Sequence, residues 1–263
     1  MKITGPFIIY TYDGTIDGLF TVVFRAFQSR SAPREILSLR LGTQIPIGDI
    51  TAVESCPEEA GRVRRGIIER SDERNLRLLQ VAHLSESKQT DMLLWKYLKK
   101  LFAMPYGEYY RNMLDEDVYD LVQTARRVKK EVHRFHGFVR FQRTRDNMYV
   151  AAIDPDNDIV RLLAPHFKSR FPDRHWLIYD VRRKCGVFFD TQSVREVELE
   201  GNAFELDTGY IGQKARALDE DYYRKLWQTY YDSVNIQERK NSRQMRSFMP
   251  GRYWKYLPEK SKK

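Results

Sequence analysis

The sequence predicts an α+β protein with a largely antiparallel central sheet packed against helices, preceded by an N-terminal α/β lobe. Two patterns indicate this: a strand and then an amphipathic helix near the start, and the order ββαβββ between residues 136 and 199. The chain has 263 residues, of which 42% are hydrophobic, enough for a substantial core. We expect an N-terminal lobe at 1–104, an α+β core with a basic C-terminal helix at 105–257, and a flexible basic tail at 258–263.

The N-terminal lobe begins with FIIYTY at 7–12, a β-branched and aromatic run that predicts a strand. Asp13-Gly14 forms a turn, after which Thr15 or Asp17 can cap a helix that reaches about Gln28. EILSLRL at 35–41 predicts a short strand. Helical spacing then resumes at Pro57 and continues until Met104-Pro105, where we place the lobe boundary.

The second lobe opens with LDEDVYDLVQTARRVKKEVHRF, a helix with acids in its first turn and bases in its last, as the helix dipole favours. HGFVRF and MYVAAI alternate like strands and predict a β-hairpin. IVRLLAPHFKSRF predicts a helix, and HWLIYDV, CGVFFD and VREVEL predict three further strands. Together these segments give the ββαβββ order.

The C-terminal region combines an aromatic helix with a basic segment. Asp219 can cap a helix in which Tyr223, Leu226, Trp227 and Tyr230 recur at helical spacing, a stripe that we assign to the core rather than to base stacking. In the segment that follows, a helix would place three arginines on one face. These are Arg239, Arg243 and Arg246.

Positive charge is concentrated in two segments. The net charge is +9, yet residues 235–263 contain nine Lys/Arg and two acids, and residues 126–146 contain eight Lys/Arg and two acids. The remaining residues therefore carry a net negative charge. Such asymmetry indicates a polyanionic partner, with solvated helix faces kept for solubility as the alternative.

The sequence lacks the signature motifs of several functional classes. There is no GxGxxG, Walker, GxSxG or HExxH motif, and Cys56 and Cys185 form no CxxC pair, so we expect a reducing compartment and neither cofactor nor metal. DPDND at 154–158 fails the calcium-loop template because Ile159 replaces the required glycine. No apolar run suits a signal peptide or a membrane span, so we expect a cytoplasmic protein.

Catalytic and binding candidates can still be named by residue type. Asp13 at a strand-to-helix turn, Asp180 at a strand end, and His136 beside His133 are the candidates for catalysis, with turn chemistry and salt bridges as the structural alternatives. Cations and rings of the two basic segments suit phosphate contacts and stacking on exposed bases. The candidate nucleic-acid-binding residues are His136, Arg140, His166, Lys168, Arg182, Arg183, Arg239, Arg243, Arg246, Arg252, Trp254 and Lys255.

Several stretches resemble a bacterial family described as a probable DNA-metabolism or DNA-repair protein, built around a domain of unknown function that would span about Ser87 to Pro258. The stretches that carry the resemblance are YDGTIDGLFTVVFRAF, FHGFVRF, LLAPHF, WLIYDVRR, NIQERKN and MPGRYWKYLPE. Members of that family are encoded beside a radical S-adenosylmethionine (radical-SAM) protein thought to act on DNA, and similar domains occur fused to uracil-DNA-glycosylase-like domains. The resemblance implies a DNA context and a radical-SAM-type partner, but it supplies no catalytic residues.

Three functions follow as hypotheses. The first is a DNA-binding accessory protein that grips phosphates with its basic segments and stacks Tyr253, Trp254 or Tyr256 on unpaired bases. The second is an enzyme acting on damaged nucleic acid, with Asp13, Asp180 or His136 in a cleft between the lobes. The third is an adaptor for the radical-SAM partner that binds no DNA. Since the chain lacks a CxxxCxxC cluster, it is not itself the radical enzyme.

Overall fold

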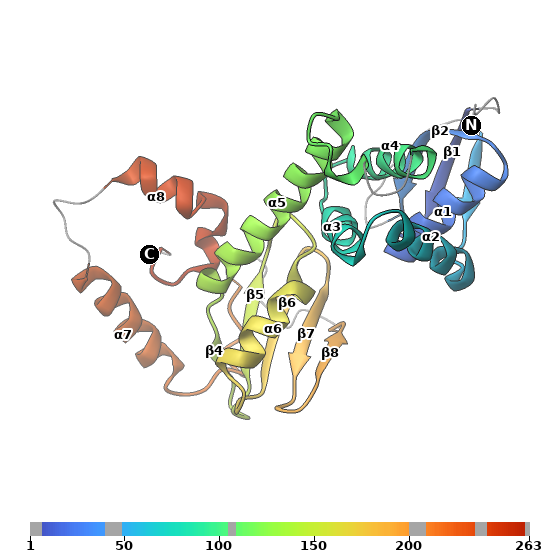
Figure 1. The fold of residues 1–263 in the computed structure, drawn as a ribbon. Coiled ribbons are helices and arrows are strands. Elements are labelled where there is room, and N and C mark those ends of the chain that lie inside the picture. Colours follow the sequence, from blue (N-terminus) through green and yellow to red (C-terminus); the bar gives the residue numbers. More distant parts are fainter. Residues whose placement is uncertain (1–6, 40–48, 105–108, 200–208, 235–240, 261–263) are drawn as a thin grey trace. The chain divides into compact units, whose positions relative to one another are not determined.

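The computed structural model describes residues 7–39, 49–104, 109–199, 209–234 and 241–260, and confirms an α+β fold with two sheets (Figure 1). The chain forms two compact units, residues 1–129 and 130–263, and passes from one to the other within helix α5 (Glu116–Phe138). The domain limits expected from the sequence remain a prediction. Within the described ranges, no helix is both long and apolar enough to cross a membrane.

The first unit contains a three-stranded parallel sheet in the order β2-β1-β3. The central strand β1 (Phe7–Tyr12) pairs with β2 (Ala32–Ser38) and with β3 (Ile50–Val53). Parallel neighbours need a crossover, which α1 (Ile16–Gln28) provides between β1 and β2. The predicted cap of this helix is confirmed, because Thr15 Oγ1 accepts a hydrogen bond from the Gly18 amide at 2.9 Å.

Helices supply the rest of the first unit and most of its core. They are α2 (Pro57–Arg70), α3 (Glu73–His83), α4 (Thr90–Ala103), the 3-10 turn η1 (Tyr109–Arg111) and the first part of α5. Their apolar faces meet α1 and the sheet in a single cluster that buries Leu19, Ile67 and Leu98 completely. The predicted N-terminal α/β lobe is thereby confirmed in its architecture.

The second unit is built on a five-stranded sheet in the order β4-β5-β6-β7-β8. Its elements are β4 (Gln142–Arg143), β5 (Tyr149–Ile153), α6 (Val160–Arg170), β6 (Trp176–Asp180), β7 (Cys185–Phe189) and β8 (Val194–Val197). Three of the four pairings are antiparallel, and β5 pairs with β6 in parallel because α6 crosses between them. The predicted ββαβββ order is confirmed.

The predicted strand HGFVRF at 136–141 is wrong throughout, because β4 begins only at Gln142. Helix α5 continues to Phe138, and only Gln142 and Arg143 pair with β5. Phe135 and Phe138, three apart on the helix, both place their rings against Tyr253, with centroid distances of 4.9 and 5.8 Å. Where the sequence predicted a strand, the end of the helix therefore packs against the C-terminal segment through an i, i+3 pair.

The C-terminal elements are α7 (Glu220–Ser233), α8 (Ser242–Phe248) and the 3-10 segment η3 (Gly251–Tyr256). From the sequence we predict that the aromatic stripe of α7 lies in the core, and this prediction is wrong. Tyr223, Leu226, Trp227 and Tyr230 are 39–56% exposed, and α7 has no buried residue. The stripe therefore leaves large aromatic surfaces accessible on one helix.

Candidate nucleic-acid interface

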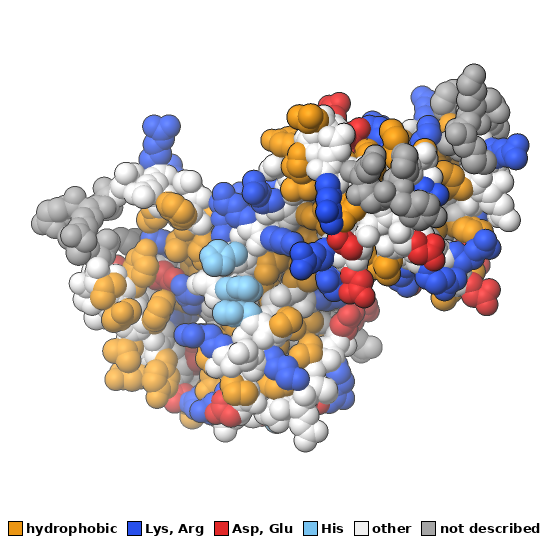
Figure 2. Space-filling model, in the orientation of Figure 1, with side chains coloured by type: hydrophobic (Ala, Val, Ile, Leu, Met, Phe, Trp, Pro, Cys, Tyr) orange, Lys and Arg blue, Asp and Glu red, His pale blue; other side chains and the backbone are white. Residues whose placement is uncertain are grey.

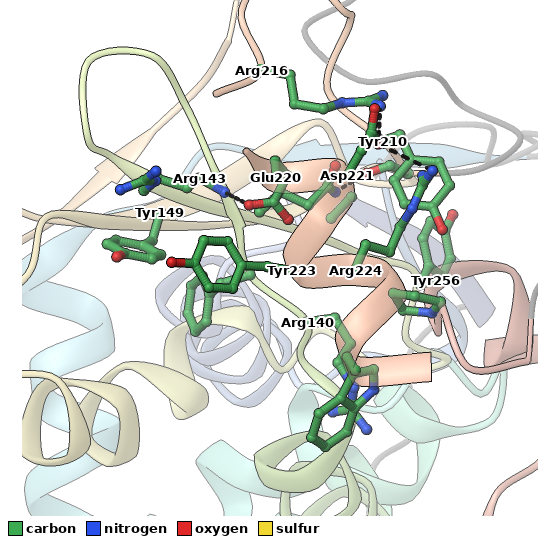
Figure 3. Close-up of a pocket in the computed structure, with 16 residues that line it drawn as sticks. Arg140, Arg143, Tyr149, Tyr210, Arg216, Glu220, Asp221, Tyr223, Arg224 and Tyr256 are labelled. Atoms are coloured by element: carbon green, nitrogen blue, oxygen red, sulfur yellow. Dashed lines mark hydrogen bonds and ion pairs between the residues drawn. The ribbon is translucent and has the colours of Figure 1, made fainter. Parts of the chain in front are cut away.

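A pocket of about 550 Å³ opens in the second unit beside the exposed aromatic helix (Figure 3). Strands β4 and β5 provide one side, the first turns of α7 a second, and η3 with Pro258 a third. The residues that line it are Arg140, Phe141, Gln142, Arg143, Tyr149, Ala152, Gly209, Tyr210, Arg216, Glu220, Asp221, Tyr223, Arg224, Trp227, Tyr256 and Pro258. We call this cavity the aromatic pocket. Its volume falls in the range of roughly 300–1,000 Å³ typical of small-molecule sites.

Gly209 forms the tightest part of the pocket wall. Its φ is +68°, a conformation that side chains rarely adopt, and a Cβ there would collide with the Tyr256 ring and approach the Ala152 Cβ. Gln142 holds this segment in place, since its Nε2 donates to the Gly209 carbonyl at 2.9 Å and its Oε1 accepts from the Ile211 amide at 3.2 Å. The backbone thus lies flat against Tyr256.

Each of the four pocket arginines is paired with an acid. Arg216 and Arg224 both reach Asp221 Oδ1, at 3.1 Å each. Arg143 pairs with Asp219, which therefore does not cap α7 with its side chain as the sequence predicts. Arg140 Nη2 lies 2.6 Å from Glu259 Oε1. The cations are consequently fixed in position and largely compensated in charge.

Aromatic rings make up the remaining wall, and two of them carry an arginine on one face. The guanidinium carbon of Arg224 lies 4.9 Å from the centroid of Tyr210, and that of Arg140 lies 5.2 Å from the centroid of Trp227. Trp227 is further fixed by donating from Nε1 to Glu259 Oε2 at 2.9 Å. A cation on one face of a ring orients it for stacking on the other face.

Two carboxylates near the pocket have opposite pKa shifts. Burial raises the pKa of Glu220, against a hydrogen bond from the Arg143 amide to Glu220 Oε2 at 2.9 Å and the charges of Arg143 and Arg216. Burial also acts to raise the pKa of Glu259, but the hydrogen bond and charge of Arg140 outweigh it, and this pKa is lowered. Glu259 is therefore held ionised, while Glu220 is the pocket acid most readily protonated.

The sequence missed most of this pocket. Of the predicted binding residues Arg140 lines it, as does Tyr256, one of the three stacking candidates, while Arg143, Arg216, Arg224 and Tyr223 were not selected. A usable signal was present: tyrosines and arginines alternate between residues 210 and 227, as in the C-terminal segment that was selected. Because the α7 stripe was predicted to be buried in the core, none of its residues was predicted to bind nucleic acid.

Four predicted cations instead converge on the loop after β5. Arg182 and Lys255 both pair with Asp154, at 2.7 and 3.1 Å, and Arg252 pairs with Asp156. Arg183 pairs with Asp180 at 2.6 Å and also donates to the carbonyls of Pro155 and Asp156. Two cations of the C-terminal basic segment, Arg252 and Lys255, therefore lie beside Arg182 and Arg183, around acids that compensate their charge.

A buried acid fastens the C-terminal segment to this same loop. Glu131, 4% exposed, accepts hydrogen bonds from the amides of Asp156 and Asn157 at 2.7 and 2.9 Å, and from the Tyr253 hydroxyl at 2.5 Å. Trp254, a predicted stacking residue, is partly buried and donates to the Met249 carbonyl at 3.0 Å. These contacts make η3 part of the scaffold of the unit.

The predicted histidines come together on α5 and α6. His136 and His166 stack with their ring centroids 4.0 Å apart, and the ring of His133 lies 6.2 Å from His136. Figure 2 shows histidine side chains gathered on one face with Lys and Arg around them. Lys168, on α6, donates to the Gln192 carbonyl at 3.1 Å and lies over the Phe189 ring.

The candidate catalytic carboxylates both have extensive internal partners. Asp180 is fully buried and accepts from the amides of Arg182 and Arg183 at 3.0 Å each; burial raises its pKa against the charge of Arg183. Asp13, in the first unit, accepts from Thr15 Oγ1 at 2.8 Å and Ser55 Oγ at 2.6 Å. These contacts give both residues structural roles, Asp13 in the turn after β1 and Asp180 at the end of β6.

The exposed arginines of α8 are predicted cations that no acid of the described residues engages. Arg243 and Arg246 are exposed and form no ion pair within the described residues. Arg239 lies outside the described residues. Arg134 of α5 donates to the Ser247 carbonyl at 3.0 Å, which brings α8 to the C-terminal part of α5. These two arginines remain available for phosphate contacts.

A family model for a domain of unknown function, DUF4130, matches residues 88–259. The chain belongs to the DUF4130 family. The matched part covers the whole aromatic pocket of this DUF4130 chain and both basic segments up to Glu259. No curated protein matches the chain.

Among solved structures, the chain is similar to a pGpG-specific phosphodiesterase, PggH from Vibrio cholerae, with a TM-score of 0.36 and 11% identity over 88% of this chain and 100% of that chain. Nothing about this DUF4130 chain's function follows from a match of that size.

Proposed function

We propose that this protein binds DNA through its second unit, takes unpaired bases into the aromatic pocket, and serves as an accessory factor in DNA metabolism or repair. The observation that supports this best is the pocket itself: rings from four separate segments, Tyr149, Tyr210, Tyr223 and Tyr256, line one cavity together with Trp227. Aromatic walls are the usual means of holding an unstacked base, because every base has a π-face. Double-stranded DNA would first have to open or extrude a base.

Phosphate contacts require cations that are not already compensated. Arg243 and Arg246 on α8 meet this requirement, and the net charge of +9 supports attraction over a longer range. The paired arginines of the pocket serve a different role, which is to orient rings. The α8 arginines would therefore supply the part of the affinity that depends on salt. The aromatic rings of the pocket would supply the contacts to bases.

A salt titration of binding to a labelled single-stranded oligonucleotide tests the proposal. If about six phosphates are contacted, log Kd should change with log salt with a slope of magnitude about 4, since each contact on a single strand contributes about 0.7. Replacing Arg243 and Arg246 with Gln should reduce that magnitude by about 1.4. Binding that is absent, or insensitive to salt, would rule out the proposal.

We also propose a radical-SAM-type protein as partner, on the strength of the family resemblance. Co-expression followed by affinity capture tests this, with the Arg243→Gln, Arg246→Gln double variant as the companion. Capture of the partner by a protein that binds no oligonucleotide would favour a pure adaptor. If DNA binding persists but the partner is not captured, the proposed radical-SAM-type partner would be ruled out.

A further inference from the structure

The aromatic pocket has room for one base with its sugar. Its walls enclose this space on three sides. Its volume is about 550 Å³, and the Gly209 backbone lies against the Tyr256 ring in its wall. A continuous stack of bases would need an extended groove, whereas a single extruded nucleotide suits a pocket of this volume. The question is then which part of the nucleotide the pocket recognises.

The charges of the pocket favour a neutral ring over a phosphate. Asp221 neutralises both Arg216 and Arg224, Asp219 pairs with Arg143, and Glu259 pairs with Arg140. A phosphate entering the pocket would have to displace these acids and would meet the negative charge of Glu220. A base carries no negative charge, so it would leave these ion pairs in place. It would also gain contact with the aromatic rings.

Glu220 is the polar group best placed to read the edge of that base. Its Oε2 accepts from the Arg143 amide, whereas Oε1 has no hydrogen-bond partner in the part of the chain that the structure describes. Asp221, the other acid lining the pocket, is already bound to two arginines. An ionised carboxylate only accepts hydrogen bonds, so it selects for donors on the ligand.

We propose that the aromatic pocket binds one extruded base and prefers guanine, whose N1–H and N2–H donate side by side to Glu220. Adenine and cytosine offer a single amino group on that edge. Thymine offers one N–H between two carbonyl oxygens, which a carboxylate repels. This preference rests on the proposed DNA binding but concerns only the pocket. A well-made two-bond contact discriminates between bases by about tenfold or more.

The protonation of Glu220 supplies an independent check. The charged groups around it are Arg143 on β4, Arg216, and the neighbouring Asp219. Because burial raises its pKa, Glu220 loses its charge at a higher pH than an ordinary glutamate. Guanine preference should therefore decline as the pH falls toward 5, while thymine affinity should stay constant or rise.

The test compares free guanosine, inosine, thymidine and guanosine monophosphate by calorimetric titration of the full chain. We expect guanosine to bind about tenfold more tightly than thymidine, inosine to lie between them, and the monophosphate to gain less than about threefold over guanosine. Glu220→Gln should abolish the preference, since its amide still accepts from Arg143 but is uncharged. Glu58→Gln, at an exposed glutamate of the first unit, should change nothing.

Oligonucleotides separate this inference from the proposed function. Oligothymidylate and the same strand with one central guanine are compared in anisotropy measurements, and this comparison also decides the matter if free nucleosides bind too weakly to measure. Equal affinity for both strands, or a preference that survives Glu220→Gln, would overturn the guanine inference and leave DNA binding intact. Failure of both strands to bind would instead defeat the proposed function.

Discussion

The imidazole rings of His136 and His166 lie almost parallel, inclined by 9° with centroids 4.0 Å apart, and so connect α5 to α6. The Nε2 atom of His136 is buried and has no hydrogen-bond partner among the residues that the structure describes. Burial lowers the pKa of His136, and the nearby charges of His166 and His133 lower it further. Two protonated rings at this separation would repel each other, so the stack favours the neutral form of His136.

Acidification should therefore destabilise the protein through this pair. A histidine whose pKa is lowered in the folded state takes up its proton first in the unfolded state, so stability falls as the pH drops through about 6.5 toward the lowered value. Denaturant unfolding at pH 7.5 and 5.5 should show a loss of about 1 kcal/mol that His136→Phe reduces. His175→Phe, at an exposed histidine outside the cluster, should leave the loss unchanged.

The contact between Arg140 and Glu259 should be among the costliest to remove. The Glu259 side chain is fully buried and also accepts from Trp227, so Glu259→Ala leaves Arg140 without its counter-charge and should cost about 3 kcal/mol. Glu196→Ala, which removes an exposed ion pair with Arg161, should cost less than about 0.5 kcal/mol. Because the pKa of Glu259 is lowered, its contribution is present above pH 4.5 and is lost as the pH falls through the lower value.

Glu220→Gln should have the opposite effect and stabilise the protein at pH 7. A carboxyl group whose pKa is raised by burial costs stability when ionised, and that cost develops as the pH rises from 4.5 through the raised value. Gln keeps an acceptor for the Arg143 amide, so the expected gain is about 0.5–1 kcal/mol. A loss of stability at pH 7 would show that Glu220 has a structural role instead.

Gly209→Ala should damage the pocket from its backbone. The new Cβ would meet the Tyr256 ring, and the positive φ would add strain, for a combined cost of about 2 kcal/mol. Gly212→Ala is the matched control, because a Cβ there meets nothing within 4 Å. Thermal unfolding compares the two variants, and equal melting temperatures would contradict the described position of Gly209.

Local sequence signals predicted much of the fold. The β1 strand, the Thr15 cap of α1 and the ββαβββ order all follow from short-range patterns, and each is present. The end of α5 was misread because the run at 136–141 is too short for its period to be certain, and Phe135 and Phe138 lie three apart, on one face of a helix. Only the packing of both rings on Tyr253, which is distant in sequence, resolves the ambiguity.

The binding site was less accessible to sequence reasoning. Counting charges located the basic segments, but it could not reveal that Asp154 would pair with Arg182 and Lys255. Helical spacing identified the stripe of α7, but periodicity alone does not say whether a face is covered. The aromatic pocket is assembled from segments between residues 140 and 258, and its existence depends on tertiary contacts such as that between Gly209 and Tyr256.

The most direct measurement is the affinity of a fluorescent single-stranded oligonucleotide for the wild-type chain, Tyr223→Leu and Tyr119→Leu. Tyr223 lines the aromatic pocket, whereas Tyr119 is 49% exposed on α5 in the first unit. We predict salt-sensitive binding that Tyr223→Leu weakens about tenfold and Tyr119→Leu leaves within about twofold. Absence of binding, or equal affinity in all three proteins, would contradict binding of bases in the aromatic pocket.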